Sequence, residues 1–288
     1  MNIPPIRRGG SGPGGAHAPH RYDKFEFERG HGDAVWQPVN GTRHKFYVYS
    51  AFYDPRGGAG KGKGGLVRVI AVTKTKNADK VWCGLRYKAD AGGGGGTKSD
   101  LVVKASVWAI RENWNLKYSA AFVLCPLGNA ESLVDVPVPD AVSVFAAEDG
   151  LEGATNLMPV LNRDYVVATN NIDSSSVGVC VKPIHFEYNK TSELIEFFEL
   201  NRLLGVSHFT LYNDTMSDEV SCVLDRYSSS KSVQLSVLEW KLNVASQTEI
   251  RTEGLFAALN DCLYRNMLRV QYLALIDFDE FIVPKRNR

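Results

Sequence analysis

Between about residues 21 and 170, apolar residues occur in short extended runs, the pattern expected of β-strands. The runs are rich in Val, Tyr, Phe and Trp, and Gly, Pro, Asp and Asn fill the breaks between them. Short strands spaced in this way predict a β-rich, sandwich-like domain over residues 21–170. The predicted strands are residues 45–53, 66–74, 80–87, 101–110, 118–125 and 141–147.

After a polar stretch at residues 170–176, the pattern changes to strands that alternate with helices. An unbroken β-branched run is typical of a strand covered on both faces, and apolar residues at helical spacing follow it, with Gly205 closing the first helix. This alternation predicts a mostly parallel α/β sheet over residues 177–288. The predicted strands are residues 177–184, 208–213, 233–240 and 272–281, and the predicted helices begin at Ser192, at Ser217 and at or just after the possible capping box Ser246–Glu249.

Composition supports a folded protein and argues against some partners. The chain has 288 residues, with 44% apolar and 23% charged side chains, which suits a soluble globular protein of two domains. Lys and Arg number 33 against 32 acids, so no general attraction for nucleic acid or an anionic membrane is expected. No apolar run reaches the roughly 18 residues of a membrane span. Residues 1–20 are rich in Gly and Pro, lack the apolar core of a signal peptide and are expected to be disordered.

The five cysteines leave the redox compartment open. They lie far apart without a Cys-x-x-Cys pair, which argues against a structural zinc site. Cys83 and Cys125 end two predicted strands and can be bridged. Free thiols in a reduced cytosol are the alternative to one or two disulfides in an oxidising lumen. The cysteines are Cys83, Cys125, Cys180, Cys222 and Cys262.

The stretch "GGAGKGKGG" resembles a phosphate-binding P-loop only superficially. Gly57-x-x-x-x-Gly62-Lys63 has the right spacing, but Gly64 stands where a Ser or Thr should bind magnesium. A strand-like run follows in place of the helix that would direct its N-terminus at phosphate. We interpret the stretch as a plain Gly/Lys loop.

The strongest chemical signal is "LALIDFDE", where Asp277 and Asp279 follow a buried strand. Ligands of open α/β sheets bind outside the carboxyl ends of the strands. Alternate residues of an extended chain point in opposite directions, so both carboxylates can hold one ion only if the chain turns. In that case their hard oxygen ligands would select Mg²⁺ or Mn²⁺, bridged to a substrate diphosphate. The alternative is an acidic loop that emerges into water.

Four further residues are candidates for ligand binding, each with a plainer alternative. His185 follows the first strand of the α/β part and can line the same edge or lie in a surface loop. Asn213, at another strand end, can bind a ligand, hold a turn or carry a glycan. Asp261 and Arg265 lie one helical turn apart and can clamp a ligand or form a plain ion pair.

Three long segments of the second half together resemble glycosyltransferase family 92, whose animal members include β-1,4-galactosyltransferases. The segments are "ELIEFFELNRLLGVSHFTLYNDT", "AALNDCLYRNM" and "YLALIDFDEFIVP". In the first half, "FYVYSAFYD", "VRVIAV" and "FVLCPL" are similar to the β-rich region that precedes the catalytic domain in that family. The resemblance covers about residues 25–288.

The resemblance implies a GT-A fold, a Rossmann-like nucleotide-binding sheet, with a UDP-sugar as donor and galactose as the expected hexose. In such folds the Asp-x-Asp, here Asp277 and Asp279, holds Mn²⁺ (or Mg²⁺) against the diphosphate, and the first acid also approaches the ribose. We therefore predict Asp277 and Asp279 as metal ligands. The predicted donor-binding residues are His185, Asn213, Asp261, Arg265 and Asp277.

The same resemblance implies the reaction and its setting. A glycan hydroxyl, on a glycoprotein or glycolipid and deprotonated by a carboxylate base, would attack the anomeric carbon as UDP departs. Glu280 lies too close to the metal pair to be nominated as that base. Family members are typically type II membrane proteins of the Golgi and secretory pathway, with a luminal catalytic part.

The resemblance also implies that the chain is incomplete, because the acceptor half of a GT-A domain begins after Asp279. We expect the base and the acceptor pocket beyond Arg288, the membrane anchor outside the chain, and poor solubility of the exposed sheet edge. The alternative is a non-catalytic carbohydrate-binding or scaffold protein with a vestigial transferase half.

Overall fold

A computed structural model describes residues 33–57, 65–88, 100–127, 137–146, 150–230, 233–283 and 285. These residues lie in one compact unit, Gly32–Arg288. The predicted disordered start, the Gly62-Lys63 part of the Gly/Lys loop and the glycine run at 92–96 lie outside the described residues.

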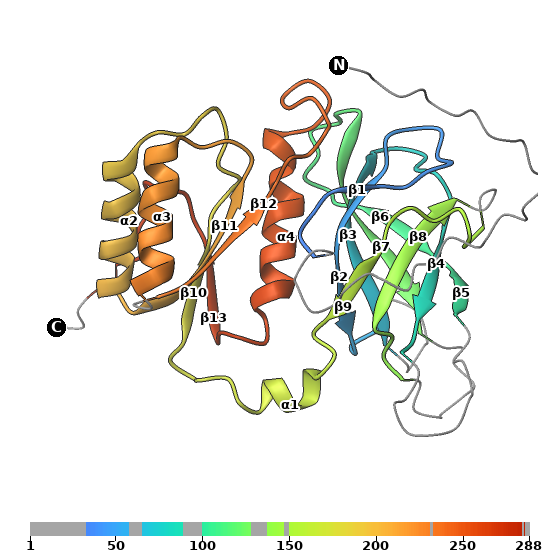
Figure 1. The fold of residues 1–288 in the computed structure, drawn as a ribbon, viewed down its shortest axis with the longest axis horizontal. Helices are drawn as coiled ribbons and strands as arrows, with labels where there is room; N and C mark the ends of the chain where they lie inside the picture. Colours follow the sequence, from blue (N-terminus) through green and yellow to red (C-terminus); the bar gives the residue numbers. More distant parts are fainter. Residues whose placement is uncertain are drawn as a thin grey trace, which may run out of the picture. The chain divides into compact units, whose positions relative to one another are not determined.

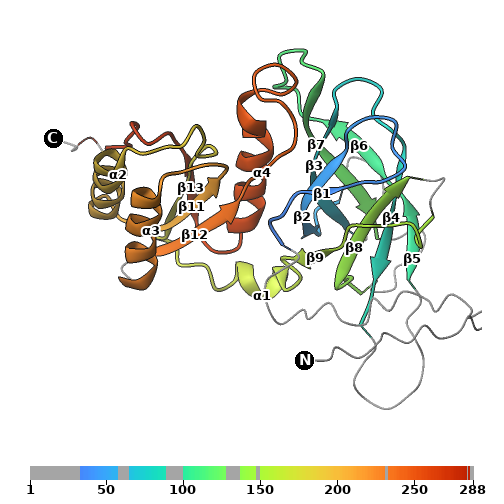
Figure 2. The ribbon, with the colours of Figure 1, turned by 45° about the horizontal axis from the view of Figure 1, so that its top comes forward.

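The described residues of the first part of the chain form a nine-stranded sheet, which Figures 1 and 2 show from two directions. Its strands are β1 (Gln37–Pro38), β2 (Tyr47–Asp54), β3 (Leu66–Lys74), β4 (Val81–Arg86), β5 (Leu101–Lys104), β6 (Ser106–Ala109), β7 (Tyr118–Pro126), β8 (Ala141–Ala146) and β9 (Met158–Leu161). The order is β5-β4-β8-β9-β2-β3-β7-β6, with β1 paired to β2. Neighbouring strands are antiparallel except β2 and β9, which are parallel.

The strand pattern read from the sequence is confirmed for the described runs, with two differences. The run at 101–110 divides into β5 and β6, and the short strands β1 and β9 were not predicted. Both are short and partly exposed, so they lack a long apolar run. The structure also joins Cys83 on β4 to Cys125 on β7, the pair that the sequence allowed.

Strand β3 is buried on both faces, which explains its nearly continuous apolar sequence. Val67 and Val69 face a core that includes residues of β2, β4, β7, β8 and β9. Ile70 and Val72 face a second core, which they share with a helix from the second part of the chain. Alternate residues of a strand point to opposite faces, so one strand serves both cores.

In the second part of the chain, the residues that the structure describes form a four-stranded parallel sheet with helices. The strands are β10 (Val177–Cys180), β11 (Val206–Asn213), β12 (Gln234–Glu239) and β13 (Tyr272–Leu275), and the helices are α2 (Thr191–Leu203), α3 (Asp218–Ser230) and α4 (Leu255–Asn266). The strand order is β12-β11-β10-β13. A short helix, α1 (Tyr165–Thr169), which the sequence pattern did not predict, precedes this part.

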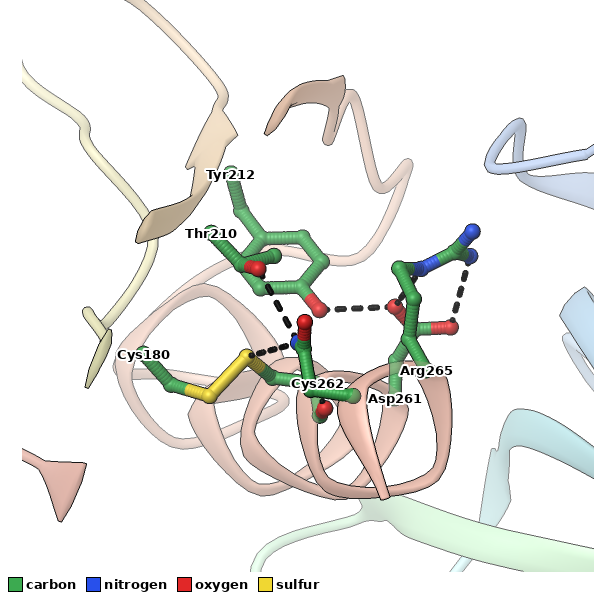
Figure 3. The surroundings of a disulfide bond; sticks show 7 residues. Cys180, Thr210, Tyr212, Asp261, Cys262 and Arg265 are labelled. Atoms are coloured by element: carbon green, nitrogen blue, oxygen red, sulfur yellow. Dashed lines mark hydrogen bonds and ion pairs between the residues drawn. A yellow bond between two sulfur atoms is a disulfide. The ribbon is translucent and has the colours of Figure 1, made fainter. Parts of the chain in front are cut away.

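The helices cover both faces of the parallel sheet, as Figure 1 shows. Val179 of β10 packs in a core with apolar residues of α2 and α3. Cys180, the next residue, faces α4, to which it is bonded through Cys262 (Figure 3). Helix α4 therefore lies between the parallel sheet and strands β2, β3 and β7 of the nine-stranded sheet.

The third predicted helix begins later than the possible capping box at Ser246. Helix α4 begins at Leu255, after a left-handed Gly254 with φ of 77°. The Ser246 hydroxyl accepts a hydrogen bond from the backbone N–H of Glu253, so it holds a loop and does not cap a helix. The described part of the chain is rich in sheet, and the division into domains at 21–170 and 177–288 stays a prediction.

The carboxylate of Asp54, at the end of β2, stabilises the folded protein. Its side chain is buried, and Arg56 and Arg68 donate hydrogen bonds to it. Burial alone would raise the pKa of Asp54, but the two arginines outweigh it and hold the pKa below 3.8. The stabilisation is therefore present above pH 3.8 and is lost as the pH falls through the lower pKa of the folded state.

We expect D54N to lower the free energy of unfolding by about 2 kcal/mol at pH 7, because it weakens the hydrogen bonds that Arg56 and Arg68 donate to a charged carboxylate. The difference between wild type and D54N should shrink below pH 3.8. Urea unfolding at a series of pH values measures it. A difference that is constant down to pH 3 would contradict the assigned cause.

Candidate functional site

A pocket of about 390 Å³ lies at the carboxyl edge of the parallel sheet, between the segments that follow β10 and β13. Its volume lies within the range of about 300–1,000 Å³ typical of small-molecule sites. Strand β10 lies at the point where the strand order reverses, since the chain proceeds from it to β11 on one side and returns to β13 on the other. Crevices at such reversals are where open α/β sheets bind ligands. The lining residues are Lys182, Pro183, Ile184, His185, Phe186, Tyr188, Asn189, Lys190, Glu193, Asp277, Phe278 and Asp279.

The chain turns immediately after β13. Such a turn is required if both carboxylates of the Asp-x-Asp are to hold one ion. The backbone N–H of Glu280 donates to the carbonyl oxygen of Asp277 at 3.1 Å. The side chain of Glu280 in turn accepts a hydrogen bond from the Asp277 N–H at 3.0 Å. The turn places Asp277 and Asp279 in the lining of the same pocket.

Lys182 supplies the positive charge nearest to Asp277. Its Nζ donates to Asp277 Oδ2 at 2.6 Å, and both side chains are half-exposed. An exposed pair of this kind contributes little to stability, so the two side chains are free to exchange partners when a charged ligand arrives.

Aromatic side chains form another part of the pocket. Tyr188 stacks on Phe278, with ring centroids 5.2 Å apart. Burial, followed by the charges of Glu193 and Asp279, raises the pKa of Tyr188 to about 12, so its phenol is neutral at physiological pH. Phe186 is 75% exposed and has a φ of 60°, which is uncommon for an aromatic residue. An apolar ring held outward at a pocket is available to stack on a planar ligand group.

Two other predicted site residues lie at the same edge of the sheet. His185 lines the pocket. Asn213 is the last residue of β11 and pairs with Ile184, so it lies beside the segment that carries His185. The Asn213 Oδ1 atom is buried without a hydrogen-bond partner among the described residues.

The structure gives Asp261 and Arg265 a different environment, shown in Figure 3. Asp261 is fully buried and accepts hydrogen bonds from Ser50, Tyr212 and Arg265. Arg265 also donates two hydrogen bonds to Asp33. Neither Asp261 nor Arg265 lines the pocket. Their part in donor binding stays a prediction.

Glu253 also lies at the carboxyl edge of the parallel sheet, and the sequence pattern did not predict it as a site residue. It lies in the loop between β12 and α4, and its Oε2 is 3.4 Å from Nε2 of His185. Burial, followed by the charge of Glu253, raises the pKa of Asp214, the residue after β11. No motif marks Glu253 in this loop, and only the fold brings it to the sheet edge.

The backbone of this loop is strained at Glu253. Thr252, Glu253 and Gly254 have φ values of 41°, 48° and 77° in succession. Left-handed conformations at residues other than glycine cost about 1–3 kcal/mol each. Strain of this kind persists where the surroundings fix the conformation, and it occurs often at functional sites.

The pocket offers two carboxylates to a cation. Among the described residues, no cluster of three or more His, Cys, Asp or Glu side chains is arranged to hold a metal. Magnesium-type sites commonly use one or two carboxylates and complete their shell with water and substrate phosphates. The donor set of Asp277 and Asp279 therefore fits a cation that is shared with a phosphate ligand.

Comparison with known proteins shows which family and which relative the chain resembles. Residues 175–288 match the sequence model of glycosyltransferase family 92. The chain is also 23% identical over 240 residues to the beta-1,4-galactosyltransferase galt-1 of Caenorhabditis elegans, a match that covers 83% of this chain and 51% of that protein. The chain thus spans about half the length of this relative.

Proposed function

We propose, from the premise that residues 175–288 belong to glycosyltransferase family 92, that the pocket binds the diphosphate of a UDP-sugar and that the complete protein transfers a hexose to a glycan hydroxyl. The single observation that carries this proposal is the position of Asp277 and Asp279 in one pocket at the reversal of strand order. The name of the worm relative supports galactose as the hexose.

The arrangement of the second part supports the finer proposal of a GT-A fold. Its sheet is parallel, helices lie on both faces, and the Asp-x-Asp follows a strand next to the reversal. In this proposal the nine-stranded sheet is the β-rich region that precedes the nucleotide-binding domain.

Five of the pocket residues have a proposed part in donor binding. Asp277 and Asp279 would hold Mn²⁺ or Mg²⁺, which when bound would supply charge stabilisation for the departing UDP. Lys182 releases Asp277 and pairs with a phosphate oxygen, since an ammonium group can exchange one oxyanion for another. Phe186 offers its ring to the nucleoside, and His185 offers a polar contact.

The acceptor side is proposed to lie outside the part of the protein described here. Glu280 lies outside the pocket lining, and it accepts a hydrogen bond from the Asp277 N–H and maintains the turn, so it is not assigned as the base. The glycan acceptor, its linkage and the transfer activity are therefore proposals for the complete protein.

We also propose the Golgi lumen as the setting, with a type II anchor carried by the complete protein. The two disulfides, Cys83–Cys125 and Cys180–Cys262, support an oxidising compartment. No helix in the described ranges combines the length and the apolar character that a bilayer span requires.

Calorimetric titration with UDP tests the proposal. Wild type should bind UDP only with Mn²⁺ present, and D277N/D279N should lose at least roughly tenfold in affinity because both metal-binding oxyanions become neutral. The matched control is D218N/D225N, which removes the same charge from exposed positions on α3.

The outcomes separate the proposed function from its alternative. Binding that is independent of Mn²⁺, or unchanged in D277N/D279N, would refute the metal-dependent socket. A folded wild-type protein that binds no UDP would instead favour a non-catalytic carbohydrate-binding or scaffold protein.

A further inference from the structure

We infer that Glu253 is a positioning residue of the donor pocket, whose carboxylate orients the imidazole of His185 toward a hydroxyl group of the bound nucleotide sugar. This inference rests on the proposed function, because the ligand is the one proposed for the pocket. It adds a residue that lies outside the pocket lining and that no sequence motif marks.

The position of Glu253 is fixed by its own backbone. Its N–H donates to the Ser246 hydroxyl at 3.0 Å, and its carbonyl accepts from Trp240 Nε1 at 2.6 Å. The left-handed conformation of Thr252 and Glu253 can persist only because such contacts determine it. The Glu253 side chain, 8% exposed, therefore has little freedom to move away from the sheet edge.

Among the described residues, His185 pairs with the carboxylate of Glu253. Its Oε2 is buried and makes no hydrogen bond to the described residues, and His185 Nε2 lies 3.4 Å from it. A buried carboxylate needs a donor or a positive charge nearby. The pairing therefore favours the tautomer of His185 with its proton on Nε2, on the side of Glu253. The Nδ1 atom of the ring is then left to interact with a ligand.

The Nδ1 atom of His185 has no partner among the described residues, and neither does Asn213 Oδ1 on the adjacent strand. In the tautomer that carries its proton on Nε2, Nδ1 accepts a hydrogen bond. Both atoms therefore require donors. A nucleotide sugar offers hydroxyl donors from two sources, the ribose and the hexose. His185 lines the pocket, so a small movement of its ring on ligand binding would bring Nδ1 to such a hydroxyl.

The test compares E253Q with E249Q, a matched change in the same loop. Glu249 forms an ion pair with Lys45 and lies outside the pocket lining. With Mn²⁺ present, E253Q should weaken the binding of UDP-galactose roughly tenfold, and E249Q should leave it unchanged. The ¹⁵N shifts of the His185 ring should move in E253Q, because its tautomer is no longer fixed by a carboxylate. Unchanged affinity and unchanged ring shifts in E253Q would overturn the inference.

Titrations with UDP and with UDP-galactose identify the source of the hydroxyl. Equal losses for both ligands in E253Q would assign it to the ribose, and a loss confined to UDP-galactose would assign it to the hexose. Both results support the inference.

A double-mutant cycle with H185A shows whether Glu253 acts through His185. All four proteins are titrated below their melting transitions, so that a change in stability does not enter the affinity. E253Q should have no further effect in the H185A background, whereas equal effects in both backgrounds would overturn the inference. If D277N/D279N abolishes UDP binding but H185A changes the binding of neither UDP nor UDP-galactose, the proposed function stands and the inference fails. If wild type binds no UDP, both fail.

Discussion

Replacing Asp261 by asparagine is expected to lower the free energy of unfolding by about 3–5 kcal/mol, the usual cost of breaking a buried ion pair from one side. Asp261 has no exposed side-chain surface and lies on α4, between the two sheets. Chemical unfolding at neutral pH measures the effect.

The expected cost follows from the hydrogen bonds around Asp261. One carboxylate oxygen accepts from Ser50 and from Arg265 Nη2. The other accepts from the Tyr212 hydroxyl at 2.6 Å and from Arg265 Nε at 2.9 Å. Burial, with the charge of Asp261, raises the pKa of Tyr212 well above its usual range, so the phenol remains a donor. Every partner donates, and an asparagine NH₂ must therefore face a donor.

A similar constellation on the surface provides the control. Glu199 on α2 accepts hydrogen bonds from Tyr227 and Arg202, but the group is exposed. E199Q should therefore leave the unfolding midpoint nearly unchanged. Y212F should destabilise wild type more than it destabilises D261N, because the two residues share one network. Additive effects of Y212F and D261N would contradict the network described here.

The same network shows how far sequence reasoning reaches. The spacing of Asp261 and Arg265 correctly indicated that they are neighbours on a helix. Spacing cannot show that this face of α4 packs against β2, where Ser50 completes the set. The ion pair lies away from the pocket because α4 packs against a segment distant in sequence, and no local pattern records that packing.

For the fold, the elements with a strong local period were predicted well. Helix α2 and strand β3 each have a continuous apolar pattern, and their bounds agree closely with those read from the sequence. The pairing order of the strands, including the placement of β13 beside β10, depends on contacts distant in sequence. The loop that carries Glu253 has no period, and three successive left-handed residues leave no recognisable signal.

Removing the Cys180–Cys262 disulfide with C180A/C262A is expected to lower the free energy of unfolding by about 4 kcal/mol. The two cysteines are 82 residues apart, and cross-links that close long loops restrict the unfolded chain most. Both side chains are fully buried between β10 and α4, so the alanines also leave space in the core. Urea unfolding of the oxidised proteins measures the loss.

The controls use the remaining cysteines. C222A should leave stability unchanged, because Cys222 is free and exposed. A thiol assay on the unfolded, unreduced chain should detect one thiol per molecule, since four of the five cysteines are paired. The double variant should also expose α4 to amide exchange earlier than α2, because only α4 loses its covalent link to the sheet. Five free thiols, or wild-type stability in C180A/C262A, would contradict this role for the disulfide.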